Sequence, residues 1–346
     1  MREARESRIP RGRAARPGPL PACGATVPRM QIGYKLFAED VAPKELIRRA
    51  VEAERAGFDF VEISDHFHPW LPEHEHSSFA WAILSAIAAK TESLRLATGV
   101  TCPSIRYHPA IIAQAAATLQ IISDGRFTLG IGAGERLSER IVGEGWPEVG
   151  DRHRRLREAL EIIRMLWSGG VHSYRGEFLR LTDARVYDLP EVLPEIVVAA
   201  GGPQAAELAA ELGDGIFSTD PDASLVEAWT AAGGDGPRYA EAPTAFAPDV
   251  RSGAESAHRA FRFGPLGWKV LAELPDPAAF DEATAAIDVD AMEEAFACGP
   301  DVERHLEVIE PYREAGFDHI ALMDGGPDPD AFFAFFADEL GPRLRA

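Results

Sequence analysis

Cysteine, lysine and long apolar runs are scarce in this sequence of 346 residues. The three cysteines, Cys23, Cys102 and Cys298, are odd in number and far apart. Neither a disulfide framework nor a paired CxxC site is therefore expected, and a reducing cytoplasm is the expected compartment. No apolar run approaches the length of about 18 residues that a membrane-spanning helix needs, so a membrane span is not expected.

Positive charge is also scarce outside the first residues. The net charge is −20, and residues 1–29 carry seven arginines against two glutamates, so the rest of the chain carries −25. This balance argues against nucleic acid and anionic membranes as partners. Residues 1–29 lack the apolar core of a secretory signal. We expect a disordered basic extension there, or a true start at Met30, with a basic arm or a transit-type segment as alternatives. Residues 30–346 are expected to form a single domain.

The rest of the chain repeats a module of helix, glycine and buried strand. Pro43 opens one helix and Gly57 ends it before a strand at 58–63, and the same order recurs around Gly316. Further strands are expected at 94–100, 126–132, 196–200, 214–218, 318–323 and near 244–246, and helices from Pro109, over 151–167 with Asp151 as cap, over 203–212 and over 290–298. About eight strands alternating with helices favour a closed (β/α)8 TIM barrel with insertions over an open sheet.

Asp65 and His66 directly follow the strand at 58–63, in the sequence "SDHFHPW". In a barrel of this kind the active site lies where strands end and helices begin. A carboxylate next to an imidazole can orient the ring and raise its basicity, which suits acid–base catalysis. The alternative is a loop histidine with a capping aspartate.

Three further histidines follow in the same segment. His68, His74 and His76 lie in a charged loop flanked by prolines, and we expect them at the solvated surface. A metal site would need additional ligands, and apart from Glu135 no carboxylate at the end of another strand is obvious. No metal is therefore expected.

Glycines follow two other strands. Glu135 ends the glycine-rich sequence "GIGAGE", which is weak evidence for nucleotide binding because tight turns need glycine anyway. Gly201 and Gly202 precede a helix, where free N–H groups could hold a phosphate or simply form a turn. Thr98 and Gly99 are small residues that would let a flat ring lie against the backbone.

Several segments in order resemble a known family. They are "IGYKLFAED", "SDHFHPW", "TGVTCPSIRYHPAIIAQAAATL", "LGIGAGERLSE", "GEGWPEVGDRHRRLREALEIIRMLWSG" and "VVAAGGPQAAELAAELGDGIFST". The chain resembles the luciferase-like barrel superfamily and, within it, the glucose-6-phosphate dehydrogenase group that uses coenzyme F420, an 8-hydroxy-5-deazaflavin. The resemblance implies a homodimeric (β/α)8 barrel that moves a hydride between an alcohol carbon and C5 of the deazaflavin.

The resemblance also implies roles for individual positions. His66 matches the active-site histidine, and Trp70 matches a tryptophan on the substrate side. Glu39 and Glu135 match acids proposed to act near the substrate or to handle protons. The positions implied or expected to bind the coenzyme are Asp65, Thr98, the Gly99–Val100 pair with its non-prolyl cis bond, Cys102, Ser138 and the phosphate loop Gly201–Gly202.

One departure from that group concerns the substrate. The sugar-phosphate enzymes place lysines after the sixth strand and in the helical insertion, whereas this chain has "STDPDASL" and only four lysines in total. A bound dianion needs charge-assisted partners, so a neutral or mostly apolar alcohol is the expected substrate. An FMN-dependent monooxygenase of the same superfamily, a coenzyme-binding protein without catalysis, and a metal-dependent hydrolase are the alternatives.

Overall fold

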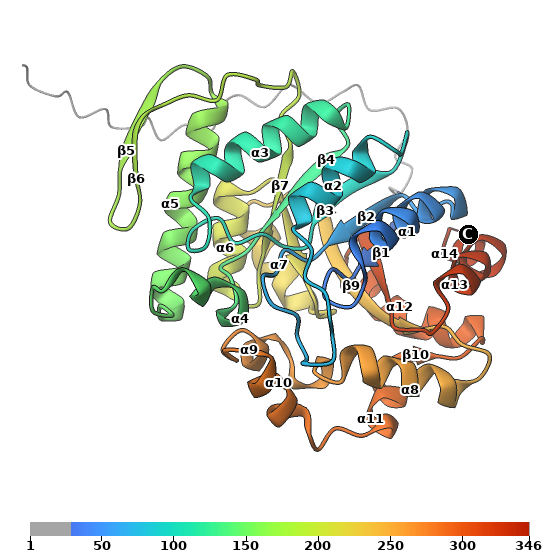
Figure 1. The fold of residues 1–346 in the computed structure, drawn as a ribbon. Coiled ribbons are helices and arrows are strands. Elements are labelled where there is room, and N and C mark those ends of the chain that lie inside the picture. The colour runs from blue at the N-terminus through green and yellow to red at the C-terminus, as the bar shows by residue number, and fades with distance from the viewer. Residues whose placement is uncertain (1–28, 346) are drawn as a thin grey trace, which may run out of the picture.

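Eight parallel strands form a closed barrel in the computed structural model, which describes residues 29–345 (Figure 1). The barrel strands are β1 (Gln31–Leu36), β2 (Phe60–Ile63), β3 (Arg95–Thr98), β4 (Phe127–Ile131), β7 (Glu195–Ala199), β8 (Gly215–Ser218), β9 (Arg238–Ala245) and β11 (His319–Asp324). They are hydrogen-bonded in the order β9-β11-β1-β2-β3-β4-β7-β8, and pairing of β8 with β9 closes the ring. The predicted (β/α)8 barrel is confirmed.

Helices cover the outside of the barrel, as the alternating pattern predicts. The helices are α1 (Pro43–Ala56), α2 (Ala80–Ala88), α3 (Pro109–Ile122), α4 (Arg136–Glu139), α5 (Val149–Trp167), α6 (Pro203–Leu212), α7 (Ala223–Ala231), α12 (Val302–Glu314), α13 (Pro329–Phe335) and α14 (Gly341–Leu344). Local signals set their ends. Pro43 occupies the first turn of α1, and Gly57 ends the helix in the left-handed conformation at a φ of 90°, which glycine adopts without steric cost.

The centre of the barrel is filled by side chains. Phe60, Val197, Phe217, Tyr239 and Ala321 form an apolar layer and are at most 5% exposed. Such a packed layer leaves no channel through the barrel, so any ligand must bind at one end of it.

An insertion between β9 and β11 lies at the end of the barrel where the strands terminate (Figure 1). It contains α8 (Val250–Phe261), α9 (Trp268–Leu271), α10 (Pro277–Thr284), α11 (Val289–Ala295) and the short strand β10 (Ala297–Cys298). The helix expected over 290–298 therefore ends earlier, since 297–298 pair with β9. The strand expected near 244–246 begins as early as Arg238 because β8 and β11 both pair with it.

Two further features differ from the expectations. Asp151 is not the cap of α5: the helix begins at Val149, and Asp151 instead accepts a hydrogen bond at 2.7 Å from Arg154 within its first turn. The antiparallel hairpin of β5 (His172–Arg175) and β6 (Arg180–Ala184) was not expected from the sequence. No helix within residues 29–345 is long and apolar enough to cross a membrane. The extension expected at 1–29 lies almost wholly outside the described residues.

Candidate functional site

His66, Glu39 and Glu135 meet at the mouth of the barrel. They come from the segments that follow β2, β1 and β4, respectively. The Nδ1 atom of His66 donates a short hydrogen bond to Glu39, and its Nε2 atom lies 3.4 Å from Glu135 Oε2. The imidazole thus lies between two carboxylates, and the structure brings together three of the four side chains that the resemblance assigned to catalysis.

Burial and mutual charge set the protonation of this cluster. Burial alone would lower the pKa of His66, but the negative charges of Glu135 and Glu39 raise it above its ordinary value. Burial would raise the pKa of Glu39, yet His66 and the hydroxyl of Ser64, which donates to Glu39 at 2.9 Å, hold it below its usual range. The pair is therefore an ionised Glu39 beside a strongly basic imidazole.

Glu135 differs from Glu39 in its environment. Its side chain is 33% exposed, but its Oε2 atom is buried and has no hydrogen-bond partner among the described residues. Burial raises the pKa of this carboxyl, and the charge of His66 opposes that rise. A buried acceptor without a partner is costly to maintain, so Glu135 is suited to hydrogen-bonding a ligand.

Trp70 forms a wall beside this cluster. Its ring meets the His66 ring edge to face, with the centroids 4.6 Å apart. On its other side it stacks on Phe263 at 4.9 Å and contacts Phe280, both of which belong to the insertion. The insertion therefore fixes the fourth predicted catalytic side chain and shields the imidazole from water.

Asp65 anchors the segment that carries His66. Its Oδ2 atom accepts hydrogen bonds from Thr101 at 2.8 Å and Trp81 at 3.2 Å. Its Oδ1 atom accepts from Tyr107 at 3.0 Å and Arg106 at 3.1 Å. A carboxylate has about four acceptor positions, so its side chain is fully engaged within the protein.

Arg106 and Glu139 extend this network, and neither was predicted as a site residue from the sequence. The guanidinium of Arg106 lies between Asp65 and Glu139, 3.5 Å from the latter. Burial raises the pKa of Glu139 to about 7, although Arg106 opposes the rise. The signal that could have found them is that both follow strand ends, in "PSIRYHP" and "GERLSE".

The predicted coenzyme-binding positions after β3 and β4 lie beside one another. The peptide bond between Gly99 and Val100 is cis, which confirms that prediction. The Thr98 hydroxyl donates to the Gly130 carbonyl at 2.8 Å, which ties β3 to β4. Cys102 and Ser138 are both buried, and the Ser138 hydroxyl accepts a hydrogen bond from the backbone N–H of Phe67 at 3.1 Å.

Gly201 and Gly202 lie at the start of α6, after the neighbouring strand β7. A Cβ atom added at Gly202 would meet nothing within 4 Å, so it would point into open space. The ring of Trp268, from α9, lies directly against Gly201, where an added Cβ would come within 2.1 Å of it. Only glycine allows this contact.

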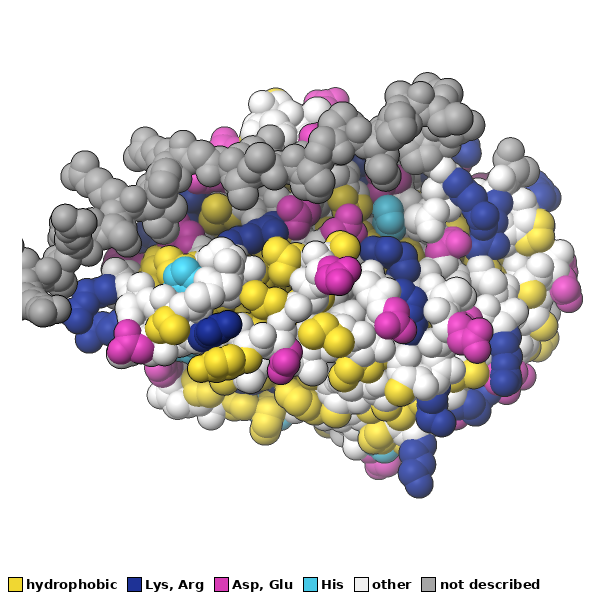
Figure 2. Space-filling model, turned by 90° about the horizontal axis from the view of Figure 1, so that it is seen from above, with side chains coloured by type: hydrophobic (Ala, Val, Ile, Leu, Met, Phe, Trp, Pro, Cys, Tyr) yellow, Lys and Arg dark blue, Asp and Glu magenta, His cyan; other side chains and the backbone are white. Residues whose placement is uncertain are grey.

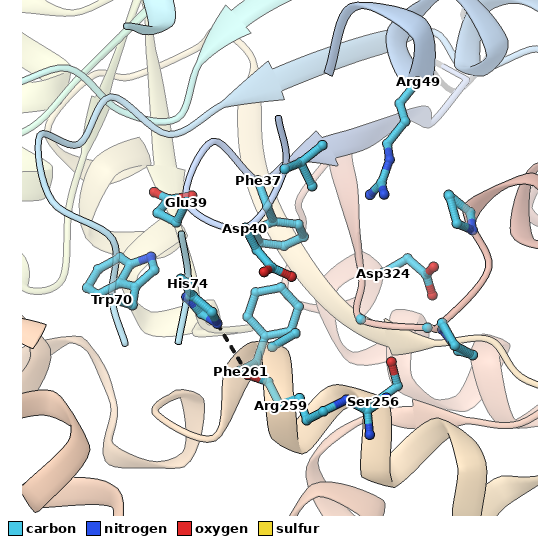
Figure 3. A pocket seen from close by; sticks show the side chains of 16 residues that line it. Phe37, Glu39, Asp40, Arg49, Trp70, His74, Ser256, Arg259, Phe261 and Asp324 are labelled. Carbon is cyan, nitrogen blue, oxygen red and sulfur yellow. Dashed lines mark hydrogen bonds between the residues drawn. The ribbon is translucent and has the colours of Figure 1, made fainter. Parts of the chain in front are cut away.

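A cavity of about 280 Å³ adjoins the cluster (Figure 3). Its lining includes Glu39 and Trp70 as well as Arg49, His74 and Arg259. His74 was expected at the solvated surface, but it is 5% exposed. The reason is that α8 packs over it, and its Nε2 atom lies 3.2 Å from the Arg259 carbonyl. The insertion thus covers a loop segment whose charged residues predict exposure to solvent.

The remaining histidines do not form a metal site. His68 and His76 are partly buried, and no group of three or more His, Cys, Asp or Glu side chains within residues 29–345 could hold a metal ion. Of the four histidines in this loop, His66 is the one that lies between the two carboxylates.

Known proteins share this architecture. The family model described as luciferase-like monooxygenase matches residues 30–319. An F420-dependent glucose-6-phosphate dehydrogenase of Beutenbergia cavernae is 35% identical, over 92% of this chain and 98% of its own length. The enzyme of the same name from Nocardia farcinica is also 35% identical, with the same two coverages.

A solved structure is similar over the same part of the chain. It is an F420-dependent secondary alcohol dehydrogenase in complex with an F420–acetone adduct, 30% identical, with a TM-score of 0.85 over 92% of this chain and 100% of that one. The family match over most of the chain, together with these relatives, shows that this protein belongs to the luciferase-like family.

Proposed function

We propose that this protein is an F420-dependent dehydrogenase or reductase that moves a hydride between an alcohol or hemiacetal carbon and C5 of the coenzyme. The observation that carries the proposal is the position of His66: it is held between Glu39 and Glu135 at the same barrel mouth as the Gly99–Val100 segment. The relatives named F420-dependent dehydrogenases, at 30–35% identity over nine-tenths of the chain, support the same chemistry.

The residues present fit a deazaflavin coenzyme. The Gly99–Val100 segment offers a backbone surface without a bulky side chain for a flat ring, and Gly202 leaves open space at the N-terminus of a ten-residue helix. The first N–H groups of such a helix lack intrahelical acceptors and favour an anion such as a phosphate. When bound, the coenzyme supplies the hydride acceptor or donor.

His66 is the side chain best placed to accept the proton of a substrate hydroxyl. Its raised pKa makes it a stronger base than a free imidazole, and Glu39 fixes the ring through Nδ1, which leaves Nε2 for the substrate. Glu135, whose buried Oε2 has no hydrogen-bond partner, can then bind the substrate hydroxyl or share its proton. Trp70 would exclude water from this side.

A neutral alcohol fits the charges at the mouth better than a sugar phosphate. Asp220 and Asp222 follow β8. The pKa of Asp220 is raised, chiefly by burial and also by the charge of Asp222. The insertion, residues 250–298, contributes one lysine, Lys269, whose charge acts on Asp220. A dianion held there would meet acids where it needs cations.

We also propose that the protein is a homodimer joined through the α3 side. Ile111, Ile121 and Ile122 of α3 are 56%, 45% and 43% exposed, and Phe79 beside α2 is 55% exposed. Seen from above, the surface of the molecule shows hydrophobic side chains interspersed with charged ones (Figure 2). Several large apolar side chains exposed along one helix are typical of a surface that another chain covers.

Coenzyme choice and substrate class are tested by one set of titrations. We expect oxidised F420 to bind with a saturable change in fluorescence, and FMN to bind far more weakly. With F420 present, small secondary alcohols should cause loss of the absorbance of the oxidised deazaflavin, and glucose 6-phosphate should not. Tight FMN binding with oxygen-dependent turnover would instead indicate a monooxygenase, and F420 binding without turnover of any alcohol would indicate a binding protein.

Replacing His66 by alanine should slow hydride transfer while leaving coenzyme affinity within a few-fold. The expected loss is roughly 10² to 10⁴-fold in kcat, the range for a positioned acid–base group. Single-turnover reduction of bound F420 measures it. The His68→Ala variant, altered in a neighbouring histidine that contacts neither carboxylate, is the control and should keep its rate. Equal turnover of the His66→Ala variant would remove His66 from the mechanism.

The pH profile should respond to Glu39. Alcohol oxidation needs His66 neutral, so kcat/KM should rise with pH through the pKa of His66, which Glu135 and Glu39 raise above its ordinary value. The Glu39→Gln variant removes one of those charges, lowers that pKa and should move the rising limb to lower pH. The Glu75→Gln variant, in an exposed carboxylate of the same loop, should not move it. A limb unchanged by Glu39→Gln would show that the limb reports another group.

The dimer proposal is tested by molar mass in solution. Wild-type protein should have twice the chain mass by light scattering, and Ile111→Asp should give the monomer mass with an unchanged circular-dichroism spectrum. Aspartate is well tolerated in the first turn of a helix, so loss of the dimer would not reflect loss of α3. The Val250→Asp variant, in an exposed valine of the first turn of α8, should remain dimeric. A monomeric wild-type protein would contradict the proposal.

A further inference from the structure

A layer of buried ionisable groups lies inside the barrel, between the apolar layer around Phe60 and Tyr239 and the mouth. It consists of Lys35 from β1, Glu62 from β2 and Glu241 from β9, which are 4%, 1% and 9% exposed. Lys35 and Glu62 are direct neighbours in the register of β1 with β2. None of the three was singled out as a site residue from the sequence.

Lys35 makes three contacts with its ammonium group. It donates to Glu62 Oε1 at 3.3 Å, to the backbone carbonyl of Gly99 at 2.9 Å, and to Glu241 in a short contact. An ammonium group has three protons to donate, so all three are used. One of them holds the backbone of the segment after β3.

Nothing separates this layer from Gly99. A Cβ added at Gly99 would lie 3.0 Å from Lys35 Nζ and 3.1 Å from Glu62 Oε1. The layer therefore touches the Gly99–Val100 segment, which follows the end of β3 at the mouth of the barrel. A displacement of the Lys35 ammonium group would therefore displace the backbone of Gly99.

Stability alone does not account for such a layer. Three ionisable groups removed from water are costly, and well-packed apolar residues in their place are often as stable or more so. The layer next to it, with Phe60 and Tyr239, shows that this barrel can be filled by apolar and aromatic side chains. Glu62 Oε2 is also buried without a hydrogen-bond partner among the described residues. These three ionisable groups lie in the layer of the barrel that is next to the proposed coenzyme site.

We propose that Lys35 is a positioning residue for the coenzyme. Its ammonium group holds the Gly99 carbonyl and so places the Gly99–Val100 segment against which the deazaflavin ring rests, while Glu62 and Glu241 hold Lys35 in place. This inference rests on the proposed function, because it requires the ring to lie on that segment. Lys35 acts through the backbone and touches no reacting atom.

The test compares Lys35→Met with a variant in which the charges are removed together. Lys35→Met leaves Glu241 and Glu62 without a cation and should lower both the Tm and the affinity for oxidised F420. We expect roughly a 10- to 100-fold weaker affinity, the range for loss of one hydrogen bond to a charged group. Fluorescence titration with F420 measures the affinity without any turnover.

The triple variant Lys35→Met, Glu62→Gln, Glu241→Met separates positioning from folding. It buries no unpaired charge, so its Tm should recover relative to Lys35→Met, whereas F420 affinity should stay low because the Gly99 carbonyl still lacks its donor. Glu62→Gln alone keeps an acceptor oxygen for Lys35 and should bind F420 within a few-fold of wild type.

Two results would overturn the inference. Either Lys35→Met binds F420 as tightly as wild type, or affinity returns together with the Tm in the triple variant, which would make the layer merely structural. If Lys35→Met does not fold, the triple variant decides alone. Failure of the wild-type protein to bind F420 is a different outcome, and it would refute the proposed function first.

Discussion

The interaction on which the site depends is the pairing of one imidazole with two carboxylates in a nearly dry barrel mouth. Isolated, each of these groups would lose its charge on burial. Together, Glu39 stays ionised because His66 faces it, and His66 keeps a raised pKa because Glu39 and Glu135 face it. The three residues follow three different strands, so the pairing exists only when the barrel has closed in its observed register.

Two buried networks keep that pairing in place. On one side, Asp65 accepts four hydrogen bonds, and its neighbour in the chain is His66. On the other, Lys35 joins β1, β2 and β9 to the backbone of Gly99. Both networks are nearly fully satisfied by protein groups, and a satisfied buried polar network makes its surroundings rigid. Glu135, at the mouth, has a buried Oε2 atom without a hydrogen-bond partner among the described residues.

The barrel and most of the residues at its mouth could be predicted from the sequence, because short stretches of neighbouring residues indicate where its helices and strands begin and end. Pro43 at a helix start, Gly57 at its end and an apolar strand immediately after it depend on neighbouring residues alone. Parallel strands ending at one edge then place the segments around His66 and Glu135 together. The cis bond at Gly99–Val100 came from the resemblance, since no local pattern requires it.

What could not be predicted depends on distant partners. The contact of Lys35 with Glu241 spans 206 positions in the chain, and neither residue has a local feature that indicates the other. His74 looked solvated because charged residues and prolines surround it, but α8, nearly 200 positions away, covers it. The insertion was hardest to predict because most of its helices are only one or two turns long and pack into one apolar cluster with Trp70.

The shortage of lysine at the mouth and the basicity of His66 are two consequences of one charge distribution. A lysine placed to hold a substrate phosphate about 8 Å from the imidazole would oppose its protonation by roughly 2 kcal/mol at an effective dielectric constant of about 20, enough to lower its pKa by more than one. Lys35 already acts on His66 in that direction, and the two glutamates outweigh it. With acids in place of further lysines after β8, this part of the mouth offers a dianion few cations, and the charges strengthen the base. An enzyme so charged is suited to a substrate that brings no charge of its own and must give up a proton from a hydroxyl group.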